Sequence, residues 1–101
     1  MKLIFISGPY RSNTVEGRLI NIDKAKSAAV MLWQKGYAVF CPHMNSAHLD
    51  GFCPDDNFLK GDLEILSRCD SIFMLKGWEN SEGAILEFET ARRMGIEIIK
   101  E

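Results

Sequence analysis

The sequence lacks the features that mark membrane proteins and nucleic-acid-binding proteins. No apolar run approaches the roughly 20 residues that a helix needs to span a bilayer, and the apolar run at residues 2–7 is too short for a signal peptide. With 12 basic and 14 acidic residues the net charge is −2, so there is no broad basic surface for a nucleic-acid polymer or an anionic membrane. One local anion site would still suffice for a nucleotide.

Cysteine is scarce, and its spacing argues against disulfides and zinc. Cys41, Cys53 and Cys69 are odd in number and form no CxxC motif, which favours free thiols in a reducing cytoplasm. Two histidines, His43 and His48, lie between the first two cysteines, but a Cys-x-His spacing is not typical of a zinc site. We therefore expect neither a metal nor a cofactor.

The length and the composition are those of one globular domain. A chain of 101 residues holds one domain, residues 1–101, and 47% hydrophobic with 26% charged residues is ordinary for a soluble protein. Short apolar runs bounded by turn residues predict strands, and apolar residues at helical spacing predict helices. The expected strands are 2–7, 37–41, 70–75 and 96–99, and the expected helices are 18–35, 57–68 and 81–94.

This alternation of strands and helices predicts an α/β fold. Short apolar strands joined by helices form a parallel sheet that is covered on both faces. We expect a single-domain Rossmann-like or flavodoxin-like three-layer sandwich with a parallel sheet of four to five strands. In such sheets ligands bind beyond the carboxyl ends of the strands, where the strand order reverses. The loops at that edge are 8–17, 42–56 and 76–83.

Polar and aromatic residues of these loops are candidates for binding a small ligand. Tyr10 and Trp78 offer stacking surfaces for a planar base, or else pack half-buried. Arg11 offers a fork for a phosphate or carboxylate, or else is a surface charge, and the histidines are structural or ligand-binding. The candidate binding residues are Ser7, Gly8, Tyr10, Arg11, Asn13, His43, Asn45, Trp78, Ser81 and Gly83.

The start of the last predicted helix has two interpretations. Its unpaired N–H groups suit a phosphate, or Ser81 caps the helix and the acids of its first turns are solvated. Glu87 lies one turn into this helix, and Asp62 lies early in the preceding helix. Two carboxylates with different roles in one site would need different environments.

Three segments together resemble the nucleoside 2-deoxyribosyltransferase superfamily, which includes the 2'-deoxynucleoside 5'-monophosphate N-glycosidases. They are residues 4–11 (IFISGPYR), 61–70 (GDLEILSRCD) and 81–91 (SEGAILEFETA), and the match covers nearly the whole chain. That superfamily acts on the bond between deoxyribose C1' and the base. The resemblance implies a small nucleoside or nucleotide substrate, no cofactor, and a homodimer or higher homo-oligomer.

The resemblance also implies roles for individual residues. Glu87 would be the nucleophile that forms a glycosyl–enzyme ester, and Asp62 would hold the sugar and the nucleophile and assist proton transfer. Ser81 and Gly83 would cradle the 5' end of the ligand. Transferases tend to carry an Asp six residues before the nucleophile, whereas the monophosphate hydrolases carry a Ser, as this chain does at Ser81.

The expected function is therefore cleavage of the N-glycosidic bond of (deoxy)nucleoside 5'-monophosphates with release of the base. A carboxylate at position 81 would repel a 5'-phosphate, which a hydroxyl beside helix N–H groups would accept. The alternatives are base exchange by a nucleoside 2-deoxyribosyltransferase, a nucleotide-binding module without turnover, and an unrelated flavodoxin-like regulatory domain.

Overall fold

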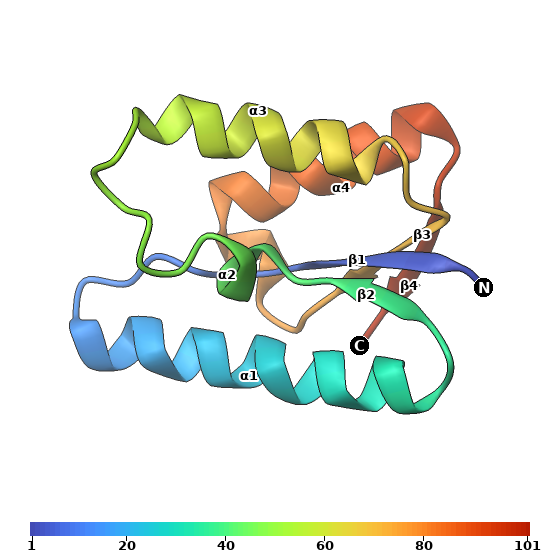
Figure 1. Cartoon of the computed structure of the whole chain (residues 1–101), viewed down its shortest axis with the longest axis horizontal. Helices are drawn as coiled ribbons and strands as arrows, with labels where there is room; N and C mark the ends of the chain where they lie inside the picture. The colour runs from blue at the N-terminus through green and yellow to red at the C-terminus, as the bar shows by residue number, and fades with distance from the viewer.

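Four strands and their connecting helices make up the chain, and a computed structural model describes all of its residues, 1–101 (Figure 1). Each expected strand and each long expected helix is present. In chain order the elements are β1 (Leu3–Ser7), α1 (Val15–Gln34), β2 (Ala38–Phe40), α2 (Pro42–Asn45), α3 (Asp55–Leu66), β3 (Ser71–Met74), η1 (Trp78–Asn80), α4 (Glu82–Met94) and β4 (Glu97–Lys100).

The strands form one parallel sheet in the order β2-β1-β3-β4. Ile4 pairs with Val39 of β2, while Phe5 on β1 pairs with Ile72 of β3. The chain moves from β1 to β2 on one side and then crosses to β3 on the other. The strand order therefore reverses between β1 and β3, and this is where a ligand site is expected.

Helices cover both faces of the sheet, so the predicted three-layer α/β fold is confirmed. In Figure 1 α1 runs along one face, and α3 and α4 lie together on the other. Each face of the sheet has its own hydrophobic core, and side chains of β1 alternate between the two. Ile4 and Ile6 pack with α1, whereas Phe5 packs on the side of α3 and α4. Ser7 alternates with Ile6 and so faces the same layer as Phe5.

The helix ends differ from the expected boundaries for local reasons. Helix α1 begins three residues early, because the Thr14 side chain accepts a hydrogen bond from the Gly17 N–H at 2.9 Å and caps it. Helix α3 also begins early, at Asp55, so its first-turn acids lie inside the helix rather than before it. Ser81 does cap α4, where its Oγ accepts from the Ala84 N–H.

The segment expected to be irregular between β2 and α3 contains one turn of helix. Pro42 stands at the first position of α2, where its missing N–H costs nothing. Since this helix starts directly after β2, it holds His43 at the carboxyl edge of the sheet. The loop after β3 likewise contains the short helix η1, which periodicity did not indicate.

We predict that Gly8→Ala destabilises the fold by about 1–3 kcal/mol, the usual effect of overpacking a core. A Cβ at Gly8 would lie 2.7 Å from Cβ and Cδ1 of Leu75, which is 3% exposed and has no room to move away. Gly61→Ala is the matched control, since nothing lies within 4 Å there and alanine favours a helix. Urea unfolding of both variants makes the comparison, and equal midpoints would contradict the close approach.

Candidate functional site

The carboxyl end of β1 meets α4 through one buried hydrogen bond. The Ser7 hydroxyl donates to Oε1 of Glu87 over 2.5 Å. Ser7 is fully buried and Glu87 is 8% exposed. A polar pair survives in such a place because each group satisfies the other. The hydroxyl of Ser7, which was expected to contact a substrate, is enclosed and bonded to Glu87, so substrate contact by Ser7 stays a prediction.

The second acid, Asp62, acts on Glu87 from α3. Burial raises the pKa of Glu87 to about 7; the Ser7 hydrogen bond opposes this increase, and the Asp62 charge adds to it. Burial also raises the pKa of half-buried Asp62 to about 6. The two expected acids therefore interact electrostatically in one region, although 25 residues separate them in the sequence. Perturbed acids of this kind gather at functional sites.

Helix α2 connects two loops at the carboxyl edge of the sheet, residues 8–17 and residues 42–56, through His43. The His43 ring is buried, and its Nε2 lies 2.8 Å from the carbonyl oxygen of Pro9. Tyr10 contacts the same ring edge-on, with centroids 5.5 Å apart. Burial lowers the pKa of His43, so the neutral ring donates from Nε2 to Pro9. Its Nδ1 has no partner in the chain. The structure thus brings together two of the predicted binding residues.

Arg11 bridges the first loop to the start of α3. Its guanidinium donates to Oδ2 of Asp55 over 2.7 Å, and both side chains are largely exposed. An exposed ion pair of this kind contributes roughly 0.2–1 kcal/mol. Arg11, Asn13 and Arg18 surround a small polar pocket with Ser12. Asp55 is a partner that sequence reasoning missed, and it competes with any anion for Arg11.

The third loop, residues 76–83, packs its aromatic side chain against the protein instead of presenting it to solvent. Trp78 stacks on Phe88 with ring centroids 4.5 Å apart, so the interpretation as half-buried packing describes it better than a free stacking surface. Ser81 is half-buried at the start of α4, where Gly83 is exposed with open space around its Cα. Asn45, at the end of α2, is exposed, and its N–H donates to the carbonyl oxygen of Cys41 over 3.0 Å.

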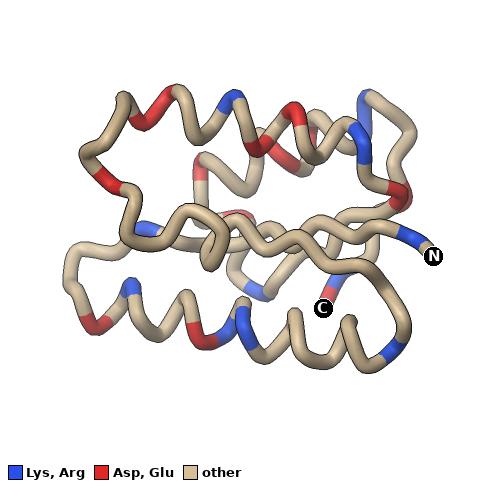
Figure 2. The backbone as a smooth tube through the Cα atoms, viewed as in Figure 1, with Lys and Arg blue, Asp and Glu red and all other residues tan.

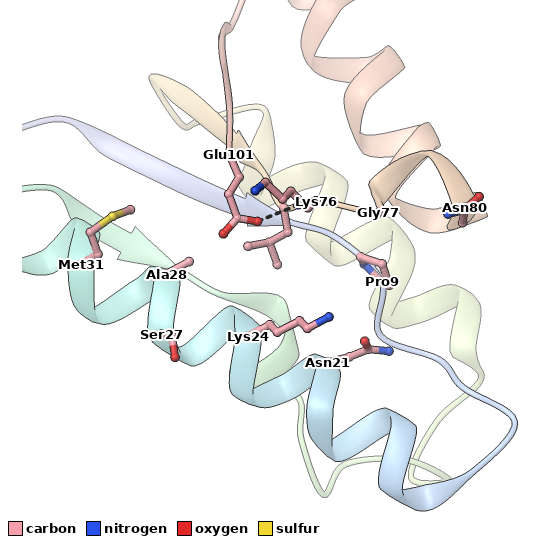
Figure 3. Close-up of a pocket in the computed structure, with 11 residues that line it drawn as sticks. Pro9, Asn21, Lys24, Ser27, Ala28, Met31, Lys76, Gly77, Asn80 and Glu101 are labelled. Atoms are coloured by element: carbon pink, nitrogen blue, oxygen red, sulfur yellow. Dashed lines mark hydrogen bonds between the residues drawn. The ribbon is translucent and has the colours of Figure 1, made fainter.

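One pocket lies on the opposite face of the sheet from the two acids. It has a volume of about 610 Å³ and includes Asn21 and Lys24 of α1 and Lys76, Gly77 and Asn80 of the third loop. Figure 3 shows the Lys24 side chain extending between α1 and this loop. None of the predicted site residues lines it. The two acids Glu87 and Asp62, whose pKa values are raised by burial, therefore lie outside this pocket.

Two further findings limit the kinds of site that the chain carries. No three His, Cys, Asp or Glu side chains gather closely enough to hold a metal ion. None of the helices has both the length and the apolar character needed to cross a bilayer.

The comparisons with known proteins agree with the fold. The chain is similar in structure to a 2-deoxyribosyltransferase from the psychrotolerant bacterium Bacillus psychrosaccharolyticus, described as a biocatalyst for the synthesis of nucleosides. The TM-score is 0.71 and the identity 22%, over 97% of this chain and 70% of that one. A search of the curated proteins finds no match.

At this level of identity the likeness establishes the fold alone. A family model described as "Domain of unknown function (DUF4406)" matches residues 2–100. Because this match covers nearly the whole sequence, the chain belongs to the DUF4406 family.

Proposed function

We propose that this protein cleaves the N-glycosidic bond of (deoxy)nucleoside 5'-monophosphates, with Glu87 as the nucleophile, and releases the base. The observation that carries the proposal is the buried Glu87 carboxyl, bonded to Ser7 and influenced by Asp62, beside the point where the strand order reverses. A carboxyl buried for packing alone is rare, since the charged form loses its hydration. A reacting sugar that carries positive charge supplies the missing partner.

In the proposed first step, one Glu87 oxygen attacks C1' as the bond from C1' to the base nitrogen breaks. The bonding electron pair leaves with the base, which takes up a proton from solvent or from an acid of the site. The charge of Asp62 acts on Glu87, and burial raises the pKa of Asp62 to about 6, so Asp62 can hold a proton near neutral pH. Water then attacks C1' as the bond from C1' to the Glu87 oxygen breaks, and the water gives up one proton to Asp62 or to solvent. This step frees the sugar phosphate and restores the Glu87 carboxylate.

Glu87 must be ionised to attack, and its surroundings determine the ionised fraction of the carboxyl at a given pH. A pKa of about 7 leaves an appreciable ionised fraction at neutral pH. Ser7 shifts this balance toward the carboxylate, because a donated hydrogen bond stabilises the charged form. Ser7 thus serves as a positioning residue that acts through Glu87.

Ser81 supports a preference for the 5'-monophosphate over the free nucleoside. It caps α4, so its hydroxyl lies beside the unpaired N–H groups of the first turn, where the helix carries partial positive charge. Glu82 is the single acid of that turn and is exposed. Arg11 contributes less directly in this proposal, because Asp55 already neutralises it.

Base exchange, as in a transferase, is the second candidate function, supported by the fold of the Bacillus psychrosaccharolyticus enzyme. Chromatography of the protein mixed with each nucleoside and each monophosphate separates the possibilities. Base released without an added acceptor base indicates hydrolysis, whereas release that requires an acceptor indicates exchange. Binding without any base release indicates a nucleotide-binding module. We further propose that the protein acts in the cytoplasm, where its three free cysteines stay reduced.

We predict that Glu87→Gln lowers the rate of base release by at least about 10³-fold. In other enzymes, removal of a covalent nucleophile lowers kcat by more than this. The amide can still accept the Ser7 hydrogen bond, so circular dichroism and the unfolding midpoint are expected to show an intact fold. Glu89→Gln is the matched control, since Glu89 pairs with Arg92 at the surface. Base release that persists in Glu87→Gln at the wild-type rate would remove Glu87 from the chemistry.

We predict that Ser7→Ala moves the acidic limb of the kcat/KM profile to higher pH by about one pH unit, the scale of one charge-assisted hydrogen bond. The hydrogen bond lowers the pKa of Glu87. Without it, less of the acid is ionised at a given pH. Ser71→Ala is the control, because Ser71 is an equally buried strand serine that donates to Glu97 over 2.7 Å, away from the site. An identical limb in both variants would refute this role for Ser7.

We predict that Ser81→Asp lowers the preference for monophosphate over nucleoside by at least about tenfold, through repulsion between the new carboxylate and the 5'-phosphate. Ser81→Asn is the control, because asparagine caps a helix as well as aspartate does but carries no charge. The ratio of kcat/KM for the two substrates is the measurement. An unchanged ratio in Ser81→Asp would show that the phosphate binds elsewhere.

A further inference from the structure

Helix α1 has two apolar faces, but the fold covers only one. Its inner face packs on the sheet through buried Ala25, Ala28, Ala29 and Leu32. A second line of apolar residues follows the same helix at spacings of three and four and is largely turned away from the core. This α1 stripe consists of Val15, Leu19, Ile22, Val30 and Trp33, with Lys26 between its two halves.

The α1 stripe is too apolar and too regular for a helix face that meets only water. Val15, Leu19, Val30 and Trp33 are 48–62% exposed, and Ile22 is half-buried. Spacings of three and four residues are those of helices that pack side by side along their length. Helix α1 has 20 residues, so it offers about 30 Å of contact at the rise of an α-helix. Such a face marks an interaction site.

We propose that the α1 stripe pairs with the same stripe of a second copy, with the two α1 helices antiparallel about a two-fold axis. In a two-fold interface, residue i meets residue j and residue j meets residue i. Leu19 and Val30 are equidistant from a point between residues 24 and 25, and Val15 and Trp33 lie almost symmetrically about the same point. The apolar residues of one stripe therefore match those of a second stripe that runs antiparallel to it.

The charges near this midpoint are complementary in the same way. Asp23 and Lys26 are both exposed and stand on either side of the axis. Neither belongs to an ion pair within its own chain. Antiparallel pairing sets Asp23 of each copy against Lys26 of the other, twice. Residues 27–34 of α1 carry no charge, as the uncoloured C-terminal half of the helix in Figure 2 shows. Along this half of the helix no like charge opposes the approach of the second copy.

This pairing would bring the second copy close to the loop between β1 and α1. Trp33 of the second copy would lie beside Val15, which directly follows the loop that carries Arg11 and Asn13. A large aromatic side chain there would buttress the first loop. The α1 stripe is thus the contact surface of the proposed homodimer. Dimerisation through it does not depend on the glycosidase chemistry, because assembly is measured without substrate.

The wild-type chain is expected to be a dimer at micromolar concentrations by light scattering, with about twice the 11.4 kDa mass of one chain. Leu19→Glu is expected to raise the dimer Kd by at least about 100-fold, since each dimer would bury two unpaired charges. Met94→Glu is the control, because Met94 is 49% exposed on α4. A monomeric wild type, or a dimer that only Met94→Glu disrupts, would overturn the proposal.

A charge exchange distinguishes the antiparallel arrangement from other uses of the same face. Asp23→Lys turns both opposite-charge pairs of its own dimer into pairs of positive charges, and Lys26→Asp turns both into pairs of negative charges. Each variant alone is expected to dimerise at least about tenfold more weakly than wild type, whereas their mixture forms a heterodimer of opposite charge. Native mass spectrometry of the mixture, with circular dichroism to verify folding, makes the test. No preference for the mixed dimer would refute the antiparallel register.

Discussion

The buried hydrogen bond between Ser7 and Glu87 connects the sheet to the chemistry that we propose. It joins the last residue of β1 to the middle of α4, across 80 positions of sequence. The bond forms only if β1 and β3 pair in their observed register and α4 packs across them, since a shift of one residue would turn Ser7 toward α1. The position of the Glu87 carboxyl is thus a consequence of the parallel sheet.

Sequence patterning predicted the architecture because its signals are local. Apolar runs next to Gly8 and Pro42, and the stop at Gly95, whose φ is 73°, delimit elements without reference to the rest of the chain. Their alternation then leaves few ways to build a sheet. The errors were local as well: the Thr14 cap extended α1, and a single turn of helix at Pro42–Asn45 is too short to show a period.

The candidate site was only partly predictable, because contacts between distant residues leave no local signal. Motif spacing selected Glu87 and Asp62, but a serine at a strand end looks the same whether it binds a ligand or a carboxyl. Ser7 was therefore assigned to the substrate, although it is enclosed and bonded to Glu87. The pairing of Arg11 with Asp55 was hidden for the same reason. The alternation of side chains along β1 was the one usable signal for Ser7. It places the Ser7 side chain on the face of the sheet that α4 covers.

Burial of Glu87 favours the proposed reaction but opposes folding at the pH where the carboxylate forms. Its folded pKa of about 7 lies above the ordinary 4.5, so its contribution to stability is complete below pH 4.5 and is lost as the pH rises through 7. The ionised acid then costs on the order of 3 kcal/mol relative to the protonated one. Ser7 keeps this cost from being larger. In the nucleotide complex that we propose, positive charge developing on the sugar would offset the cost at the reacting centre, so the same burial that weakens the free protein would strengthen its hold on the transition state.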